Sequence, residues 1–210
     1  MATVLVVGSP YRLSTGRIIA RHAAERGHTV RYLTDPEGPG ERPGEDPFAG
    51  ADGIVLVPHR GDPRRHTEGA TRTVLARAAR HGTSAHLVLF SSFAVGHGPA
   101  HPLNRLTPTL LPSRLVAEEL VRGSGRPHTV VRPTWMTDDP PGSHAVTLTR
   151  HPHADGMIAR ADMAAVIVAA LEEPAARGTT FTLFNEPGPA PVSFAEAFAA
   201  LARDPREGPS

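Results

Sequence analysis

Residues 4–17, VLVVGSPYRLSTGR, combine an apolar run, a glycine turn and the start of a helical pattern. The apolar run has the length of a buried strand and stops at Gly8, and a helical pattern begins at Thr15. A strand, a glycine turn and a helix in this order open the units of α/β proteins that bind phosphate at a helix N-terminus. Such turns usually carry three glycines, whereas this one has only Gly8 and Gly16. The stretch therefore predicts the fold and leaves open whether a phosphate site is kept.

Strand-like runs alternate with helical patterns along the rest of the chain, which predicts an α/β fold with a parallel sheet and helices on both faces. The expected strands are residues 3–8, 28–33, 53–58, 86–92, 128–133 and 180–185. The expected helices are residues 15–27, 67–82, 111–125 and 161–173, and a last one that begins at Ser193 with Glu196 as its capping-box partner.

Two segments do not fit this alternation. Residues 34–52 are rich in Pro, Gly and acidic residues and are expected to form a loop, so the sheet should lack or shorten one strand after the second. Residues 134–160 form the largest irregular segment, which we expect over the carboxyl ends of the strands. We expect one domain over residues 1–203 and a polar tail over residues 204–210.

The composition excludes several kinds of partner and site. The 22 basic and 21 acidic residues nearly cancel, which argues against a nucleic acid or an anionic membrane as partner. There is no cysteine, so disulfides and cysteine metal sites are excluded. Because neither a basic leader nor a long apolar run is present, we expect a cytoplasmic protein. Its expected partner is a small-molecule substrate, and the chain is expected to be a monomer or a homodimer.

Three blocks of the sequence resemble one family in their order and spacing. They are LVLFSSFAVGHGPAHPLNRL (residues 87–106), VAEELVRGSGRPHTVVRPTWMTDDPPG (116–142) and IARADMAAVIVAAL (158–171). Together they resemble the atypical short-chain dehydrogenase/reductases, most closely the NmrA-like NAD(P)H-binding proteins and the biliverdin reductase B type of flavin reductase. The resemblance implies a Rossmann-like fold from residue 4 to about residue 201 and NADP or NAD as the cofactor.

The chain departs from this family in the half that would hold the nucleotide. If Gly16 matches the third glycine of the family, the turn has gained two residues and lost the middle glycine that lets backbone approach the pyrophosphate. Thr34 ends the second strand, where family members that prefer NADP commonly carry arginine. The choice between NAD and NADP, and the survival of the site itself, stay open at this point.

Candidate cofactor ligands lie at the first turn and after the third strand. Side chains just before the first helix could bind phosphate together with its free amides. A basic cluster after residues 53–58, which includes Arg64, Arg65 and His66, could add positive charge. Each of these side chains could instead be solvated in a loop. The predicted cofactor-binding residues are Gly8, Arg12, Ser14, Thr15, Gly16, Thr34, His59 and Arg60.

The substrate side is expected where residues 86–92 and 128–133 end. Ser91 and Ser92 stand where the resemblance implies a substrate-facing hydroxyl, so both are candidate catalytic residues, with bonds to local backbone as the alternative. Thr134, Trp135 and Met136 stand in the family's substrate-side loop. The sole tryptophan could stack on a flat ring or belong to the core.

Two histidine pairs invite a metal site and do not predict one. His97 with His101, and His151 with His153, flank prolines that break the local backbone, and no carboxylate completes either set at a diagnostic spacing. We therefore expect no metal.

The missing residue types limit the chemistry. The only tyrosines are Tyr11 and Tyr32 and lysine does not occur, so the Tyr-x-x-x-Lys pair of many short-chain dehydrogenases cannot form. Quinones, flavins and enones need no such donor, because solvent or a serine hydroxyl can serve. We expect an NAD(P)H-dependent oxidoreductase acting on a flat conjugated molecule of this type. The alternatives are a cofactor-independent isomerase or cyclase, and a non-catalytic regulator that senses a nucleotide or metabolite.

Overall fold

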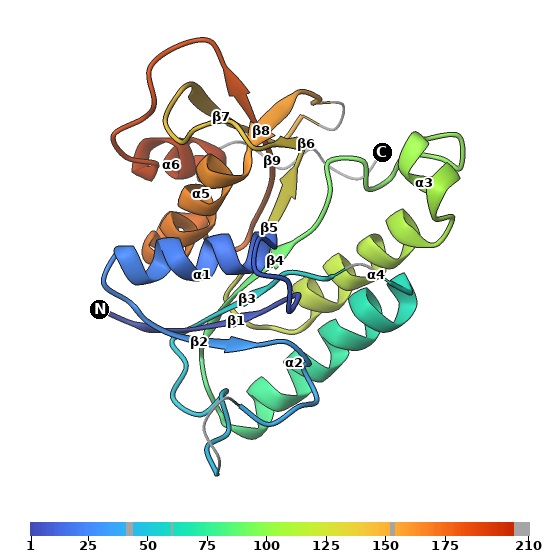
Figure 1. Ribbon diagram of the computed structural model, residues 1–210, viewed down its shortest axis with the longest axis vertical. Coiled ribbons are helices and arrows are strands. Elements are labelled where there is room, and N and C mark those ends of the chain that lie inside the picture. The colour runs from blue at the N-terminus through green and yellow to red at the C-terminus, as the bar shows by residue number, and fades with distance from the viewer. Residues whose placement is uncertain (41–43, 60, 152–153, 204–210) are drawn as a thin grey trace.

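The computed structural model describes residues 1–40, 44–59, 61–151 and 154–203, which are built around one large sheet (Figure 1). The sheet has seven strands in the order β2-β1-β3-β4-β5-β9-β7, and every neighbouring pair is parallel except β9 with β7. A second, two-stranded parallel sheet joins β6 to β8. The strands are β1 (Thr3–Val7), β2 (Thr29–Leu33), β3 (Gly53–Leu56), β4 (His86–Phe90), β5 (His128–Pro133), β6 (Trp135–Thr137), β7 (Ala145–Thr149), β8 (Met157–Ala159) and β9 (Thr179–Glu186).

Helices cover both faces of the large sheet (Figure 1). One face packs against α1 (Thr15–Glu25), α5 (Arg160–Glu172) and α6 (Ala195–Arg203), and the other against α2 (Ala70–Arg80) and α4 (Leu110–Gly123). The short helical segments are η1 (Arg64–Gly69), α3 (Pro102–Leu106) and η2 (Pro174–Ala176). Within the described residues, no helix is long and apolar enough to cross a membrane.

The first strand shows why the sequence folds in this way. Val4 and Val6 pack in the core under α1 and α5, whereas Leu5 and Val7 pack in the core under α2 and α4. Side chains alternate between the faces of a strand, so a strand that is covered on both faces must be apolar throughout. Each such side chain contributes roughly 1.5–3 kcal/mol when it is fully buried.

The topology confirms the predicted sheet and its missing strand. In the described part of residues 34–52 the chain forms turns and no strand, and β3 lies directly beside β1. As a result β2 is an edge strand. The fold is Rossmann-like with one strand fewer on the β2 side, as the Pro- and Gly-rich loop indicates.

The prediction that residues 134–160 are irregular is wrong. This segment contains β6, β7 and β8, and β7 forms the antiparallel edge of the large sheet. These strands are short, and every residue of β7 is only half-buried, so they carry no continuous apolar run to reveal them.

Several helix boundaries also differ from the expected ones. A π-helical turn, η1, precedes α2, and α3 was not expected. The last helix begins at Ala195, whose amide donates to Ser193 Oγ at 3.1 Å. The predicted polar tail lies outside the described residues.

Candidate active site

The predicted site residues meet at the carboxyl edge of the large sheet. The glycine turn follows β1, His59 follows β3, the paired serines follow β4, and Thr134 follows β5. From β1 the chain passes to β2 on one side and then crosses to β3 on the other side of β1. Open α/β sheets bind their ligands outside the carboxyl ends of the strands at this kind of crossover.

The enlarged turn is built around a buried tyrosine. Tyr32 Oη donates to the carbonyl oxygen of Ser9 at 2.7 Å. A Cβ atom placed on Gly8 would lie 2.9 Å from Tyr32 Oη, and one placed on Gly16 would lie 2.7 Å from it. Both distances are shorter than packed atoms normally approach. Burial raises the pKa of Tyr32, so its hydroxyl stays protonated and keeps the bond to Ser9. The two remaining glycines are therefore required by Tyr32, whatever ligand they face.

The helix that follows this turn offers an anion site. Ser14 caps α1, because its Oγ accepts from the Arg17 amide at 3.4 Å and its hydroxyl donates to the Ser9 carbonyl at 3.3 Å. Within the described residues, the amides of Thr15 and Gly16 have no acceptor. Two free amides at the positive end of a helix are what a phosphate group binds.

The extra residues of the turn do not fill the cleft. Tyr11 and Leu13 are 74% and 86% exposed, and Arg12 is exposed as well. Gly8 lines an open pocket beside the turn. A turn folded into the cleft would have favoured a protein that has abandoned its nucleotide, and the observed turn projects into solvent instead. The role of Arg12 as a phosphate ligand stays a prediction.

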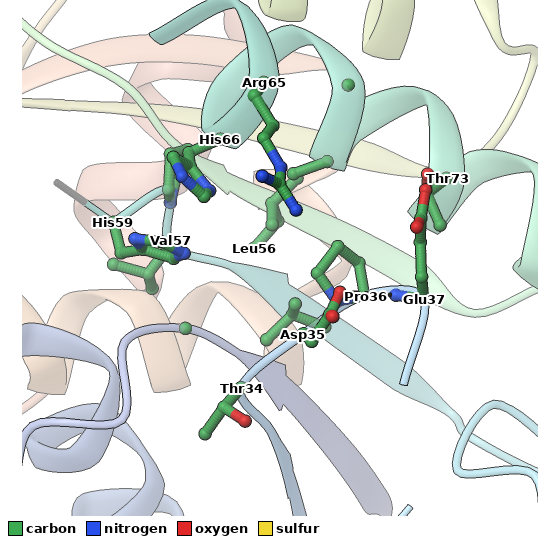
Figure 2. A pocket seen from close by; sticks show the side chains of 15 residues that line it. Thr34, Asp35, Pro36, Glu37, Leu56, Val57, His59, Arg65, His66 and Thr73 are labelled. Carbon is green, nitrogen blue, oxygen red and sulfur yellow. Dashed lines mark hydrogen bonds between the residues drawn. The ribbon is translucent and has the colours of Figure 1, made fainter. Parts of the chain in front are cut away.

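The pocket beside Gly8 has a volume of about 200 Å³. The ends of β1 and β3, the segment after β2, η1 and α2 line it (Figure 2). Complete ligand pockets usually measure roughly 300–1,000 Å³, so this one suits a part of a ligand, such as the base of a nucleotide. The pocket adjoins the turn at Gly8.

Basic side chains line one wall of this pocket. In Figure 2, Arg65 reaches down from η1, and the rings of His59 and His66 lie close together, with centroids 4.0 Å apart. Burial lowers the pKa of His66, and the neighbouring His59 and Arg65 lower it further, so His66 is neutral at pH 7. His59, Arg65 and His66 line the same pocket, and their role in binding a cofactor stays a prediction. Arg60 lies outside the described residues.

An acidic residue that the sequence reasoning passed over lies at the end of β2. Thr34 is exposed and lines the pocket, and so does the next residue, Asp35. Asp35 Oδ1 accepts from the amide of Glu37 at 2.9 Å, which fixes the carboxylate at the pocket (Figure 2). In Rossmann folds an acid near this strand end binds the ribose 2′-hydroxyl of NAD.

Ser91 belongs to a buried charge network. Its hydroxyl donates to Glu118 Oε1 at 2.5 Å, and Glu118 is fully buried. Arg132 binds the same carboxylate through Nε at 2.9 Å and Nη2 at 2.6 Å, and Arg122 Nη2 binds it at 2.7 Å. Burial alone would raise the pKa of Glu118, but Arg132, Ser91 and Arg122 together hold it below its ordinary value. Ser91 thus ties β4 to α4 and β5, and we do not carry it forward as a catalytic residue.

Ser92 is placed differently from its neighbour. It is half-buried, and its Oγ accepts from the amide of Ala94 at 3.3 Å. In this bond the serine is the acceptor, so the hydroxyl hydrogen remains for a ligand. Ser92 is the serine that we keep as the candidate donor at the substrate.

Of the three predicted substrate residues, Thr134 is buried and Trp135 and Met136 are partly exposed. Thr134 is buried, and its hydroxyl donates to the carbonyl oxygen of Leu183 at 3.1 Å, so it holds the chain against β9. Trp135 and Met136 are 39% and 37% exposed. Met136 Sδ lies 4.0 Å from Thr15 Oγ1, which places β6 beside the N-terminus of α1. Only Trp135 and Met136 can contact a substrate there.

Trp135 belongs to an aromatic group that also contains Phe93, His97 and His101. The Phe93 and Trp135 ring centroids are 5.4 Å apart, edge to face, and the His101 ring lies parallel to the Trp135 ring within 9° at 6.3 Å. His101 Nδ1 accepts from the Leu103 amide at 3.3 Å, so the hydrogen of the neutral imidazole is on Nε2. The association of these four residues could not be predicted from the sequence, because they come from the segment after β4 and from β6.

The histidine pairs take no metal-like arrangement in the described part of the chain. The His97 and His101 rings are 5.0 Å apart, and no group of three or more His, Cys, Asp or Glu residues in that part is placed to hold an ion. His153 lies outside the described residues.

A mostly parallel sheet with a glycine turn and a free helix N-terminus at the β1 crossover is typical of dinucleotide-binding α/β proteins. Comparison with known families then places it more closely. Residues 45–174, more than half of the chain, match the NAD(P)H-binding family, and the chain belongs to this family. The predicted family and the predicted nicotinamide cofactor are thereby confirmed. No curated protein matches the sequence.

Solved structures confirm the fold. A protein of Bacillus halodurans described as an NAD-dependent epimerase/dehydratase is 20% identical with a TM-score of 0.77, over 96% of this chain and all of its own. A Streptococcus pneumoniae protein described as an NADH-flavin reductase is 16% identical with a TM-score of 0.68, over 89% of this chain and all of its own. The Escherichia coli O157:H7 anaerobillin reductase ChuY is 18% identical with a TM-score of 0.60, with the same coverage.

Proposed function

We propose that this protein is an NAD(P)H-dependent oxidoreductase that reduces a flat conjugated acceptor of the quinone, flavin or enone type. The observation that carries the proposal is the aromatic group beside Ser92. Phe93 follows Ser92 directly and its ring contacts Trp135, which is partly exposed. Large aromatic side chains at a site edge favour flat ligands, on which they stack. The similarity to proteins described as a flavin reductase and an anaerobillin reductase supports the same substrate class.

The residues at the carboxyl edge fit a dinucleotide in an extended orientation. The pocket between Asp35 and Arg65 would take the adenosine half. The free amides of Thr15 and Gly16 would take the pyrophosphate, and the nicotinamide end would then point toward Ser92. When bound, the cofactor supplies a hydride.

The protein's own part in the reaction is placement and hydrogen bonding. Ser92 would donate its hydroxyl hydrogen to an acceptor oxygen, where negative charge develops. Trp135 and Phe93 would hold the ring plane and exclude water from one face. Because an acceptor of this class is protonated by solvent, the absence of the Tyr-x-x-x-Lys pair does not obstruct the reaction.

The first test measures reduction of 1,4-naphthoquinone by NADH and NADPH. We expect Trp135→Leu to lower kcat/KM for the quinone about two- to tenfold, because loss of ring stacking removes roughly 0.5–1.5 kcal/mol of binding. Trp135→Phe keeps a flat ring and should retain most of the activity. The dissociation constant of the cofactor should be the same in both variants. Absence of quinone, flavin and enone reduction in the unmodified protein would refute the proposed function.

Asp35 is expected to set the preference between the two cofactors. Its carboxylate suits the 2′-hydroxyl of NADH and repels the 2′-phosphate of NADPH. We therefore expect NADH to bind more tightly, and Asp35→Ser to shift the ratio of dissociation constants toward NADPH about tenfold, which corresponds to about 1.4 kcal/mol. Glu37→Ser removes a charge from the same segment and serves as the control. An equal shift in the two variants would show that only net charge matters.

A further inference from the structure

Arg114, on the first turns of α4, is a guanidinium that forms no ion pair within the described residues; its Cζ lies 5.5 Å from the centre of the Phe90 ring, and Glu118 attracts it from a distance. Its Nη1 donates to the carbonyl oxygen of Phe90 at 2.5 Å, at the carboxyl end of β4. Its Nε is buried and has no hydrogen-bond partner. Burial lowers the pKa of Arg114 to about 10, which still leaves it charged at pH 7. A half-buried guanidinium with a buried, unpaired Nε and no carboxylate partner is costly, so this position needs an explanation.

The bond to Phe90 has a structural reason that does not account for the charge. In the register of β3 with β4, where Leu56 pairs with Leu89, the next amide of β3 that could reach the Phe90 carbonyl belongs to residue 58. That residue is Pro58, which has no N–H. Arg114 supplies the missing donor. A neutral side chain could do this equally well, so the positive charge is left without a role in the bond.

The surrounding carboxylates do not neutralise Arg114. Glu118, one helical turn further along α4, attracts Arg114 but forms no direct ion pair with it, because Arg132 and Arg122 bind its two oxygens. Within the described residues no acidic group lies within 4.0 Å of the Arg114 guanidinium, and Nη2 has no partner there. Two guanidinium groups thus bind this one carboxylate, and Arg114 adds a third positive charge nearby, at the carboxyl end of β4.

We propose that Arg114 binds an anionic group of the substrate, so that the acceptor is a flat conjugated molecule that carries a carboxylate or a similar oxyanion. The inference rests on the proposed function for the identity of the ligand as a substrate. Arg114 is partly exposed, and the Phe90 carbonyl that holds it is two residues before Ser92. A guanidinium whose Nη2 is unused is a strong receptor for a carboxylate. The anionic group would thus anchor the molecule while its ring lies against Trp135.

The position of Arg114 favours the substrate over the cofactor phosphates as the source of the anion. The free amides of Thr15 and Gly16 at the start of α1 already suit the pyrophosphate. Arg114 lies instead at the end of β4, which β3 separates from β1. The same strand end carries Ser92, on the side where the aromatic group lies.

The test uses calorimetry on the cofactor-free protein with two ligands of the same ring, 2-naphthoate and 2-naphthamide. We expect the unmodified protein to bind the carboxylate at least about tenfold more tightly than the amide, which corresponds to about 1.4 kcal/mol. Arg114→Gln keeps a donor for Phe90 and removes the charge, so it should lose this preference. Arg114→Lys keeps the charge and should retain part of it. Thermal unfolding of each variant shows that it is folded.

Three outcomes would overturn the inference. The first is equal binding of the two ligands, or no binding of either, by the unmodified protein. The second is a preference that survives in Arg114→Gln. The third is a weaker affinity of Arg114→Gln for NADH, with the naphthoate preference unchanged, which would assign the charge to the cofactor. Quinone reduction is measured separately, so failure of the proposed function can be told apart from failure of this site.

Discussion

Glu118→Gln should lower the free energy of unfolding by about 3 kcal/mol at pH 7. Removal of one member of a buried ion pair leaves the other charge without compensation and costs roughly 3–5 kcal/mol. We take the lower end, because the side chains of Arg132 and Arg122 are 21% and 36% exposed and water partly compensates them. Urea unfolding of both proteins measures the difference. Glu119→Gln, on the exposed face of the same helix, makes the same change of charge and should cost less than about 0.5 kcal/mol.

The same variant has an expected pH dependence. The pKa of Glu118 is lowered in the folded protein, so its stabilising effect is complete above the ordinary glutamate pKa of roughly 4.3. The effect is lost as the pH falls through the lowered value. The difference in stability between the unmodified protein and Glu118→Gln should therefore shrink below about pH 4. A difference that is small at pH 7, or constant down to pH 3, would contradict the network described for Ser91 and Glu118.

Gly16→Ala should destabilise the protein by about 2–3 kcal/mol and weaken NADH binding at least about tenfold. The new Cβ would lie 2.7 Å from Tyr32 Oη, and a retreat of Tyr32 would break its bond to the Ser9 carbonyl and its contact with Arg17, which lies 3.6 Å from the centre of its ring. We therefore expect the turn and the start of α1 to shift, and the free amides to shift with them. Alanine normally stabilises a helix relative to glycine, so a loss here opposes the ordinary trend.

Tyr32→Phe provides the matched partner for this substitution. Alone it should cost about 1 kcal/mol, because the Ser9 carbonyl loses a donor. Combined with Gly16→Ala it removes the clash, so the double variant should be more stable than Gly16→Ala and should recover much of the affinity for NADH. Gly123→Ala, a helical glycine with open space around it, is the control and should be neutral or stabilising. Additive effects of Gly16→Ala and Tyr32→Phe would show that Tyr32 does not shape the turn.

Much of the fold could be predicted because the buried strands are apolar throughout. The run that became β1 is covered on both faces, and the helix that became α5 is buried over most of its length. The segment after Thr134 could not be predicted in the same way. Its strands owe their existence to partners elsewhere, such as the antiparallel pairing of Ala145 with Glu186, and not to a local pattern.

The strand ends that carry the candidate site residues could be predicted from the sequence, but the contacts of the individual side chains could not. The sequence places Ser91 and Ser92 at the correct strand end, and their alternation implies that they face opposite sides. It does not say which one faces the buried Glu118, because that depends on a helix 27 residues further along the chain. The contact of Tyr32 with the turn could not be predicted either, since Tyr32 comes from β2 and lies beside Gly16 only in the folded protein.

We infer that the two-glycine turn and the pocket beside it still bind a nicotinamide dinucleotide. Calorimetric titration of the purified protein with NADH, followed in parallel by the fluorescence of Trp135, tests this most directly. We predict one site per chain with a dissociation constant on the order of 10 µM, and an affinity at least about tenfold weaker for Gly16→Ala. No binding of NADH or NADPH at millimolar concentration would contradict the account and leave a Rossmann-like scaffold without its cofactor.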